Sequence, residues 1–377
     1  MALDRIRLGW FRNHRATALE GTQKFNLLVG DNGAGKTNIL EAISLFAPGR
    51  GLRRAALPDM AGQSGDGAFA VSADLMADQA AVRLGTGTAP DKPGRRLVRV
   101  NGADATALSL SQWLGIFWLT PAMDRLFMDS PGARRRFLDR LALALDPTHA
   151  TNAARAEAAI RERNRILAAP QEPDPRWLDA IETQVAQFGS ALAQTRAALI
   201  AALNAKLETL PPSPFARPAL AYAPGGPLTP EALREALHTN RRQDRAAGRT
   251  LTGPHRDDLT VIMAAKNQPA ADCSTGEQKA MLIAITLAHA DLTPADLTPS
   301  DLSPSDLSPR LLLLDEVAAH LDPIRRAALF ERLAAGPAQV WMTGTELAPF
   351  APIAPHSACW WVEDGQVKRD GKNEPQS

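Results

Sequence analysis

Eight consecutive residues near the N-terminus have the types and spacing that could bind a polyphosphate. They fit the pattern G-x-x-x-x-G-K-[ST] and are Gly30, Asp31, Asn32, Gly33, Ala34, Gly35, Lys36 and Thr37. Glycine lets the backbone approach a phosphate closely, because no Cβ is in the way. The N–H groups of the loop and of the following helix then face the anion. In this pattern Lys36 carries a positive charge to the β- and γ-phosphates, and Thr37 offers a hydroxyl to Mg²⁺.

The residues on either side supply the elements that such a loop needs. Residues 25–29 are mostly apolar and predict a buried strand. Residues 38–46 predict a helix with one apolar face, formed by Ile39, Leu40, Ile43 and Phe46. A chance glycine turn is the alternative, but it requires neither the strand nor the helix. Strand, glycine loop and helix together predict a phosphate-binding loop.

A second candidate half of the site lies far along the chain. Four leucines, at 311–314, precede Asp315 and Glu316. So apolar a strand is typical of the interior of a parallel sheet, and ligands bind at the carboxyl ends of such strands. Asp315 would hold Mg²⁺, and Glu316 would polarise an attacking water, with Lys36 as the other catalytic residue. A buried strand ending in two exposed acids is the alternative.

Composition limits the classes of protein to which this chain can belong. Its 377 residues are enough for two domains or one large one, and its net charge of +1 confines any nucleic-acid surface to a local patch. The two cysteines are far apart in sequence, which indicates a reducing compartment and a cytoplasmic location. No apolar run reaches the roughly 18 residues that a membrane span needs, so we expect no membrane partner.

The chain divides into sheet-forming and helical stretches. Strands are predicted at residues 3–8, 25–29, 68–75, 80–84, 97–100, 116–119, 219–222, 259–263, 311–314 and 340–342, with a hairpin turn at Asn101-Gly102. A helix with an apolar side begins near Arg134, and another is predicted at 230–237. From 146 to 210 the pattern is helical apart from a proline-marked turn at 170–175. The second of these helices would be about 50 Å long, and two helices joined in this way predict an antiparallel arm, unless they form an ordinary helical subdomain.

Residues 291–309 repeat a unit of five, Asp-Leu-Thr/Ser-Pro and one further residue. A proline in each unit forbids a helix, and one leucine per unit buries little surface. We therefore expect an exposed insertion; a pentapeptide β-helix coil is the alternative.

Clustered arginines are candidate contacts for phosphate or DNA. They are Arg53, Arg54, Arg134, Arg135, Arg136, Arg241 and Arg242. A solvated charged face is the alternative for each cluster.

Two further motifs complete an ordered set. Ser274-Thr275-Gly276-Glu277, followed by an apolar helix at 280–290, resembles the signature motif of ABC-type ATPases. Residues 319–322, which end in Asp322, resemble their D-loop. In these ATPases two heads stack head to tail. The resemblance therefore implies an ATP-dependent homodimer in which Ser274 and Gly276 of one copy meet the γ-phosphate held by the other.

Nearly the whole chain resembles the RecF family of SMC-like ABC ATPases. The resemblance rests on residues 11–13, 33–38, 40–43, 49–53, 130–139, 252–259, 274–279 and 321–326, of which Gly253-Pro254-His255-Arg256-Asp257-Asp258 is the most family-specific run. It implies an α/β fold: an SMC-like P-loop ATPase head with mixed sheets and a smaller helical lobe. The head would comprise 1–119 and 250–377, and the lobe 120–249. Arg12, Asn13, Asn38 and Asp322 join the expected ATP-binding residues.

The resemblance also implies a function. Such proteins bind DNA as ATP-clamped dimers at gaps and junctions between duplex and single strand. They work with RecO and RecR to load RecA, and they support replication restart and the SOS response through slow, DNA-stimulated ATP hydrolysis. This chain departs from many ABC ATPases by having Thr343-Gly344-Thr345 in place of a switch histidine, and by lacking a clear Q-loop glutamine. An ATP-binding scaffold with little hydrolysis, another SMC-like ATPase and a transporter motor are the alternatives.

Overall fold

The described residues form two compact units. The computed structural model describes residues 3–63, 65–77, 80–171, 173–211, 213–297, 309–318 and 321–370. The first unit combines the described residues up to Met123 with those from Pro309 onward, and the second runs from Asp124 to Leu297. Residues 250–297 therefore belong with the helical unit, whereas the sequence placed them in the ATPase head.

The first unit contains a largely parallel sheet that carries the two candidate halves of the site. Its strand order is β15-β14-β3-β13-β12-β8, and only β15 is antiparallel to its neighbour. The strands are β3 (Phe25–Val29), β8 (Gly115–Leu119), β12 (Arg310–Leu314), β13 (Gln339–Gly344), β14 (Ser357–Glu363) and β15 (Gln366–Arg369). Every residue of β3 and β12 is buried, which confirms the two strands predicted beside the glycine loop and the acidic pair.

A second sheet of the same unit is antiparallel, in the order β2-β1-β4-β5-β6-β7. Its strands are β1 (Leu3–Phe11), β2 (His14–Glu20), β4 (Ala70–Ala77), β5 (Ala80–Ala89), β6 (Lys92–Val100) and β7 (Ala103–Asp104). The predicted hairpin turn is confirmed, because Asn101 (φ 51°) and Gly102 (φ 85°) both adopt the left-handed conformation between β6 and β7. Strand β2 was not predicted. Two of its three buried side chains, those of His14 and Thr17, are polar, so the segment lacks the alternation of apolar and polar residues that is typical of a strand.

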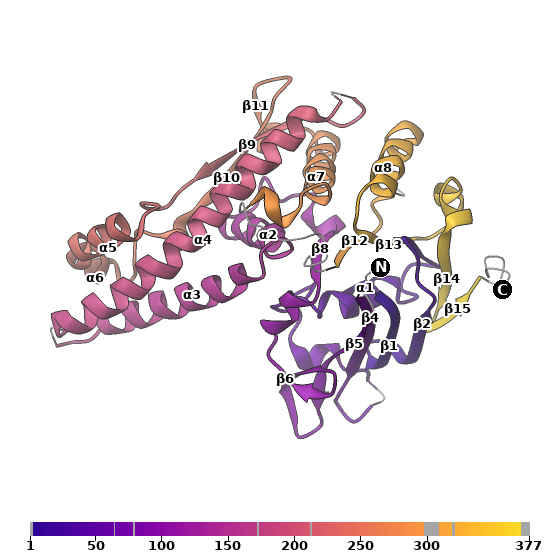
Figure 1. Cartoon of the computed structure of the whole chain (residues 1–377), viewed down its shortest axis with the longest axis horizontal. Helices are drawn as coiled ribbons and strands as arrows, with labels where there is room; N and C mark the ends of the chain where they lie inside the picture. Colours follow the sequence, from indigo (N-terminus) through magenta and orange to yellow (C-terminus); the bar gives the residue numbers. More distant parts are fainter. Residues whose placement is uncertain are drawn as a thin grey trace. The chain divides into compact units, whose positions relative to one another are not determined.

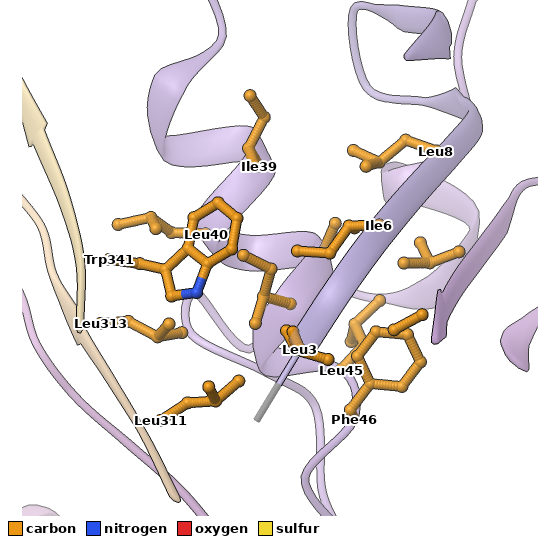
Figure 2. Packing of buried hydrophobic residues seen from close by; sticks show 14 of the residues in the cluster. Leu3, Ile6, Leu8, Ile39, Leu40, Leu45, Phe46, Leu311, Leu313 and Trp341 are labelled. Atoms are coloured by element: carbon orange, nitrogen blue, oxygen red, sulfur yellow. The ribbon is translucent and has the colours of Figure 1, made fainter. Parts of the chain in front are cut away.

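Helix α1 (Lys36–Ser44) begins at the end of the glycine loop and lies in the hydrophobic core of this unit. Figure 2 shows Ile39 and Leu40 of α1 beside Ile6 of β1, with Leu313 and Trp341 of the parallel sheet. This core joins the two sheets through the helix, so the loop that precedes α1 has a rigid support. Helix α8 (Pro323–Ala335) connects β12 to β13.

The second unit is built around a two-helix arm. Helices α3 (Thr148–Leu167) and α4 (Pro175–Thr209) are joined by a short loop and lie side by side (Figure 1). The antiparallel arm is confirmed; α4 has 35 residues, or about 50 Å of helix. The other elements are α2 (Pro131–Leu143), α5 (Pro230–Thr239), α6 (Arg241–Ala247), α7 (Thr275–Ala290) and a three-stranded sheet in the order β11 (Gln268–Pro269), β10 (Asp258–Met263) and β9 (Pro218–Ala223).

A buried ion-pair network braces the arm. Arg163 of α3 is completely buried and donates to Glu182 of α4 at 3.0 Å and to Asp244 of α6 at 2.6 Å. Its remaining hydrogen bonds reach Thr250 and the carbonyl of Leu237. A buried guanidinium needs all of these partners, so the network specifies how α6 docks on the arm.

The start of the repeat differs from the expected exposed insertion. Leu292 and Leu297, the leucines of its first two units, are buried. Thr293 and Asp296 form a capping box around a short 3₁₀ turn. Residues 298–308 lie outside the described part of the chain, so the prediction for the later units remains untested.

Among the described residues no helix combines the length and the apolar character needed to cross a bilayer.

Candidate nucleotide-binding site

Two glycines of the loop are required for different reasons. Gly33 (φ 85°) and Gly35 (φ 117°) are both in the left-handed region. A Cβ on Gly35 would lie 2.7 Å from Nε2 of His14, whereas a Cβ on Gly33 would meet nothing within 4 Å. Gly35 therefore allows the loop to rest on the side chains behind it, and Gly33 lies on the side open to a ligand.

Lys36 is buried and bonded to the loop that precedes it. Its ammonium donates to the carbonyls of Gly30 at 2.6 Å and Asp31 at 2.8 Å. Burial lowers the pKa of Lys36, and the nearby carboxylates of Glu316, Asp315 and Asp31 act in the opposite direction. A phosphate bound in the loop could replace these two carbonyls as the hydrogen-bond partner of the Lys36 ammonium.

The structure brings the two predicted halves of the site together. The Thr37 hydroxyl donates to Oδ1 of Asp315 at 2.9 Å. Asp315 follows the last residue of β12, and its amide donates to the carbonyl of Leu119 on β8 at 3.0 Å. Glu316 comes next with a left-handed backbone (φ 54°). A hydroxyl beside a carboxylate is an oxygen donor set of the kind that Mg²⁺ prefers.

The glycine loop is supported by hydrogen bonds from residues distant in sequence, and the sequence alone gave these residues no such supporting role. His14 places Nε2 3.1 Å from the carbonyl of Gly35 and Nδ1 3.0 Å from that of Gly365. The amide of Gly365 in turn donates to the carbonyl of Ala34 at 2.9 Å. Asn13, expected to bind nucleotide, also donates to Ala34 at 2.9 Å. No local spacing could signal these contacts, because His14 and Gly365 lie 351 residues apart.

A buried carboxylate organises the polar side chains beside α1. Glu41 is completely buried and accepts two hydrogen bonds of 2.9 Å from Arg12 and one of 2.9 Å from Arg53. Arg53 also donates to Oδ1 of Asn38 at 2.6 Å. Arg53 was predicted to contact DNA and Arg12 to contact nucleotide, and both are anchored to Glu41. Neighbouring side chains line a hollow of about 470 Å³: Trp10, Arg12, Asn13, Arg15, Asn38, Asp59, Ala61, Gly62 and Gln63.

The signature motif lies in the second unit, at the start of α7. Ser274 is the N-cap of α7, and it forms a capping box with Glu277. Both the amide and the hydroxyl of Ser274 lie 2.9 Å from Oε2 of Glu277, and Lys266 binds the other oxygen at 2.5 Å. These contacts lower the pKa of Glu277 to about 2, the hydrogen bond from Lys266 being the largest cause. A Cβ on Gly276 would meet nothing within 4 Å, so the backbone there is open to a partner.

Asp322 caps α8, accepting from the amide of Arg325 at 2.9 Å. The preceding residues 319 and 320 of the expected D-loop lie outside the described part of the chain.

Several candidate DNA contacts are occupied by internal partners. Arg134 forms a two-bond ion pair with Asp258 at 2.7 Å, Arg135 donates to the carbonyl of Asp257 at 2.6 Å, and Arg241 pairs with Glu182 at 2.6 Å. Of the candidate DNA-contact arginines that lie in the second unit, only Arg136 and Arg242 are exposed and make no ion pair or hydrogen bond among the described residues. The sequence could not separate these two kinds of arginine, because all of them lie in equally basic runs.

Comparisons with known proteins identify the family. The family model described as RecF/RecN/SMC N terminal domain matches residues 2–346. A DNA replication and repair protein RecF from Mesorhizobium japonicum is 46% identical, and the match covers 97% of each chain. The chain belongs to the RecF family. A second RecF, from Brucella suis, is 44% identical over 97% of this chain and 96% of its own. The resemblance inferred from the sequence is confirmed.

Solved structures show the same fold. A RecF–ATP structure from the RecFOR pathway has a TM-score of 0.81 and 21% identity, and covers 98% of both chains. A second RecF structure, with ATPrS, has a TM-score of 0.79 and 20% identity, and covers 98% of this chain and 99% of its own. An SmcHead bound to the C-winged helix domain of ScpA has a TM-score of 0.51 and 16% identity over 98% of both chains. The predicted α/β, SMC-like ATPase fold of this RecF-family chain is confirmed.

Proposed function

We propose that this chain is an ATP-dependent DNA-binding ATPase of recombinational repair and replication restart. The observation that carries the proposal is the convergence of Lys36, Thr37, Asp315 and Glu316 at the carboxyl ends of the parallel strands. This is the edge at which an α/β sheet binds ligands. The names of the relatives, which are DNA replication and repair proteins, support the biological setting.

Different residues of the loop would bind different parts of the nucleotide. The backbone from Gly30 to Thr37 and the start of α1 would cradle the phosphates, because their N–H groups are donors at a helix N-terminus. Lys36 would exchange its loop carbonyls for phosphate oxygens. The ribose and base would lie toward the hollow bordered by Arg12, Asn13 and Asn38. The ATP-bound RecF structure supports ATP as the ligand.

Thr37 and Asp315 fit an Mg²⁺ site by the chemistry of their oxygens and by their 2.9 Å separation. Bound there, Mg²⁺ would offset negative charge on the β- and γ-phosphates. Glu316 follows Asp315 and would accept a proton from the attacking water. Lys36 would balance charge on the transferred phosphoryl group, so Glu316 and Lys36 are the proposed catalytic residues.

We further propose that two copies complete each site. Ser274 and Gly276, at the open N-terminus of α7, would contact the γ-phosphate held by a second copy, with Asp322 nearby in the same interface. ATP would then hold a dimer together, and hydrolysis would release it. The clamp would act on gapped DNA and duplex–single-strand junctions with RecO and RecR, upstream of RecA and of the SOS response, and DNA would stimulate its slow hydrolysis. The naming of the RecFOR pathway supports these partners.

The test is light scattering and gel shift with a gapped duplex, with and without ATP and Mg²⁺. ATP should double the molecular mass and tighten DNA binding, and a fully matched duplex of equal length is the control. An unchanged mass and an unchanged DNA affinity would refute the clamp.

A scaffold that binds ATP with little hydrolysis is the second candidate, favoured by the absence of a histidine at Thr343-Gly344-Thr345. The substitution Glu316→Gln separates the two. In a hydrolysing clamp it should prolong the lifetime of the ATP-bound dimer, measured by adding excess ADP. A scaffold should show the same dimer lifetime before and after the substitution.

A further inference from the structure

One buried hydroxyl lies between the two acidic residues of the candidate site. Thr343, on β13, is completely buried. Its Oγ1 donates to Oδ1 of Asp315 at 2.8 Å and accepts from the backbone amide of Glu316 at 2.9 Å. A threonine hydroxyl has one proton and two lone pairs, so it can make both bonds at once. A single side chain thus touches the carboxylate proposed to hold the cation and the backbone of the residue proposed to accept the proton.

These bonds determine which atoms of Asp315 remain available. Thr37 of α1 and Thr343 of β13 both donate to Oδ1 of Asp315, at 2.9 and 2.8 Å respectively. Among the described residues no hydrogen bond is made to Oδ2 of Asp315. The carboxylate is therefore held in one rotamer with its second oxygen unused. Outer hydrogen bonds that orient a carboxylate in this way are typical of residues that bind a metal ion.

The same hydroxyl also holds an unfavourable backbone conformation. Glu316 has φ 54°, which non-glycine residues adopt rarely. Such conformations persist where surrounding structure over-determines them, and they are common at functional sites. The bond from the Glu316 amide to Thr343 is such a constraint, and it directs the chain where the Glu316 side chain begins.

The residue that follows Thr343 contacts the beginning of the glycine loop. The next residue, Gly344, accepts a hydrogen bond from the amide of Gly30 at 3.2 Å, and it pairs in register with Val29 of β3. The end of β13 is therefore fixed to the beginning of the loop. No side chain larger than hydrogen fits at Gly344, since a Cβ there would lie 2.5 Å from the Phe350 ring.

We propose that Thr343 is the positioning residue that couples cation binding at Asp315 to the placement of Glu316. The inference rests on the proposed ATPase function and assigns a role to the position where the sequence lacks a histidine. Thr343 acts through Asp315 and Glu316, so it orients the residues that meet the nucleotide. The role needs a hydroxyl on a short side chain, which serine retains and valine, of similar shape, lacks.

The experiment measures nucleotide affinity with a fluorescent ATP analogue, in EDTA and in Mg²⁺, together with kcat and KM for hydrolysis. The variants are Thr343→Val and Thr343→Ser, and Thr345→Val is the matched control because Thr345 is exposed two residues along. Thr343→Val should keep wild-type affinity in EDTA but lose about 10-fold or more of the gain due to Mg²⁺, as substitutions beside a metal ligand do. Its kcat should fall with little change in KM, and Thr343→Ser should restore both.

Three results would overturn the proposal. Equal loss of affinity in EDTA and in Mg²⁺, or no rescue by serine, would make Thr343 a purely structural residue and overturn the proposal. Wild-type behaviour of Thr343→Val would overturn it too. If Thr343→Val does not fold, Thr343→Ala replaces it, with the same expected loss of the Mg²⁺ effect. A wild-type chain that neither binds nor hydrolyses ATP would refute the proposed function itself, which is a different outcome.

Discussion

The hydroxyl of Thr37 donates a 2.9 Å hydrogen bond to the carboxylate of Asp315, although 278 positions separate the two residues. The bond connects the helix that follows the glycine loop to the end of an interior strand of the parallel sheet. The bond brings the expected phosphate-binding loop and the expected cation ligand into one site.

Thr37→Val and Asp315→Asn should each lower kcat for ATP hydrolysis by about 100-fold or more, because each removes part of one cation site. The double variant should lose little beyond either single variant, since groups that act as a unit are not additive. Steady-state phosphate release measures all three, and Thr37→Ser, which keeps the hydroxyl, is the control. Additive losses would mean that the two residues act separately.

Glu41 is expected to be a major structural residue of the loop region. It is completely buried and accepts from Arg12 and Arg53, so Glu41→Gln should lower the free energy of unfolding by about 2 kcal/mol. Glu20, whose exposed side chain pairs with Arg5 at 2.8 Å, is the matched control, and Glu20→Gln should cost less than about 1 kcal/mol. Urea unfolding monitored by circular dichroism would compare them, and equal effects would contradict the assignment.

Acid should weaken the packing behind the loop. Burial lowers the pKa of His14 below its ordinary value of 6.5, outweighing the hydrogen bonds to Gly35 and Gly365. Between 6.5 and the lower folded value the unfolded chain binds the proton more readily, so the free energy of unfolding falls as pH falls through this window. Unfolding measured across the window should show a shallower fall for His14→Asn.

Two further histidine variants accompany the pH series. His255 is half-buried, and desolvation lowers its pKa too, so His255→Asn in the second unit should also make the fall in unfolding free energy shallower. His356 is exposed, and His356→Asn controls for the loss of a histidine. A His14→Asn slope equal to that of the wild type would show that His14 does not contribute to acid sensitivity.

Arg136 and Arg242, the two exposed arginines of the predicted clusters in the second unit, should contact DNA phosphates. Arg136→Ala and Arg242→Ala should each reduce the slope of log affinity against log salt by about one, because one phosphate contact is lost. Arg165→Ala is the control, since this exposed arginine already pairs with Glu162 at 2.6 Å. Fluorescence anisotropy over a salt series gives the slopes, and an unchanged slope removes that arginine from the DNA surface.

Local patterns were sufficient where a residue's role depends on its immediate neighbours. The glycine loop, the strand before it and the helix after it follow from eight residues and their flanks, because turn geometry and apolar periodicity are local properties. The same holds for the all-leucine strand, for the arm helices and for the hairpin at Asn101-Gly102. Even without the structure, these residues indicated a P-loop protein with an acidic strand end and a helical arm.

Only the tertiary structure decided which polar residues support that site. His14 and Gly365 stand in no recognisable spacing to the loop, and the sequence around Glu41 and Thr343 does not reveal their partners, because these contacts form only when separate segments of the chain become neighbours in the fold. The same reason explains why Arg134 and Arg136 looked alike: a charge run shows that arginines are present, but Asp258 claims one and leaves the other exposed only once the chain has folded. Loop geometry and helix or strand periodicity depend on neighbouring residues and can be inferred from the sequence. The burial of a side chain and the identity of its ion-pair partner depend on the path of the whole chain.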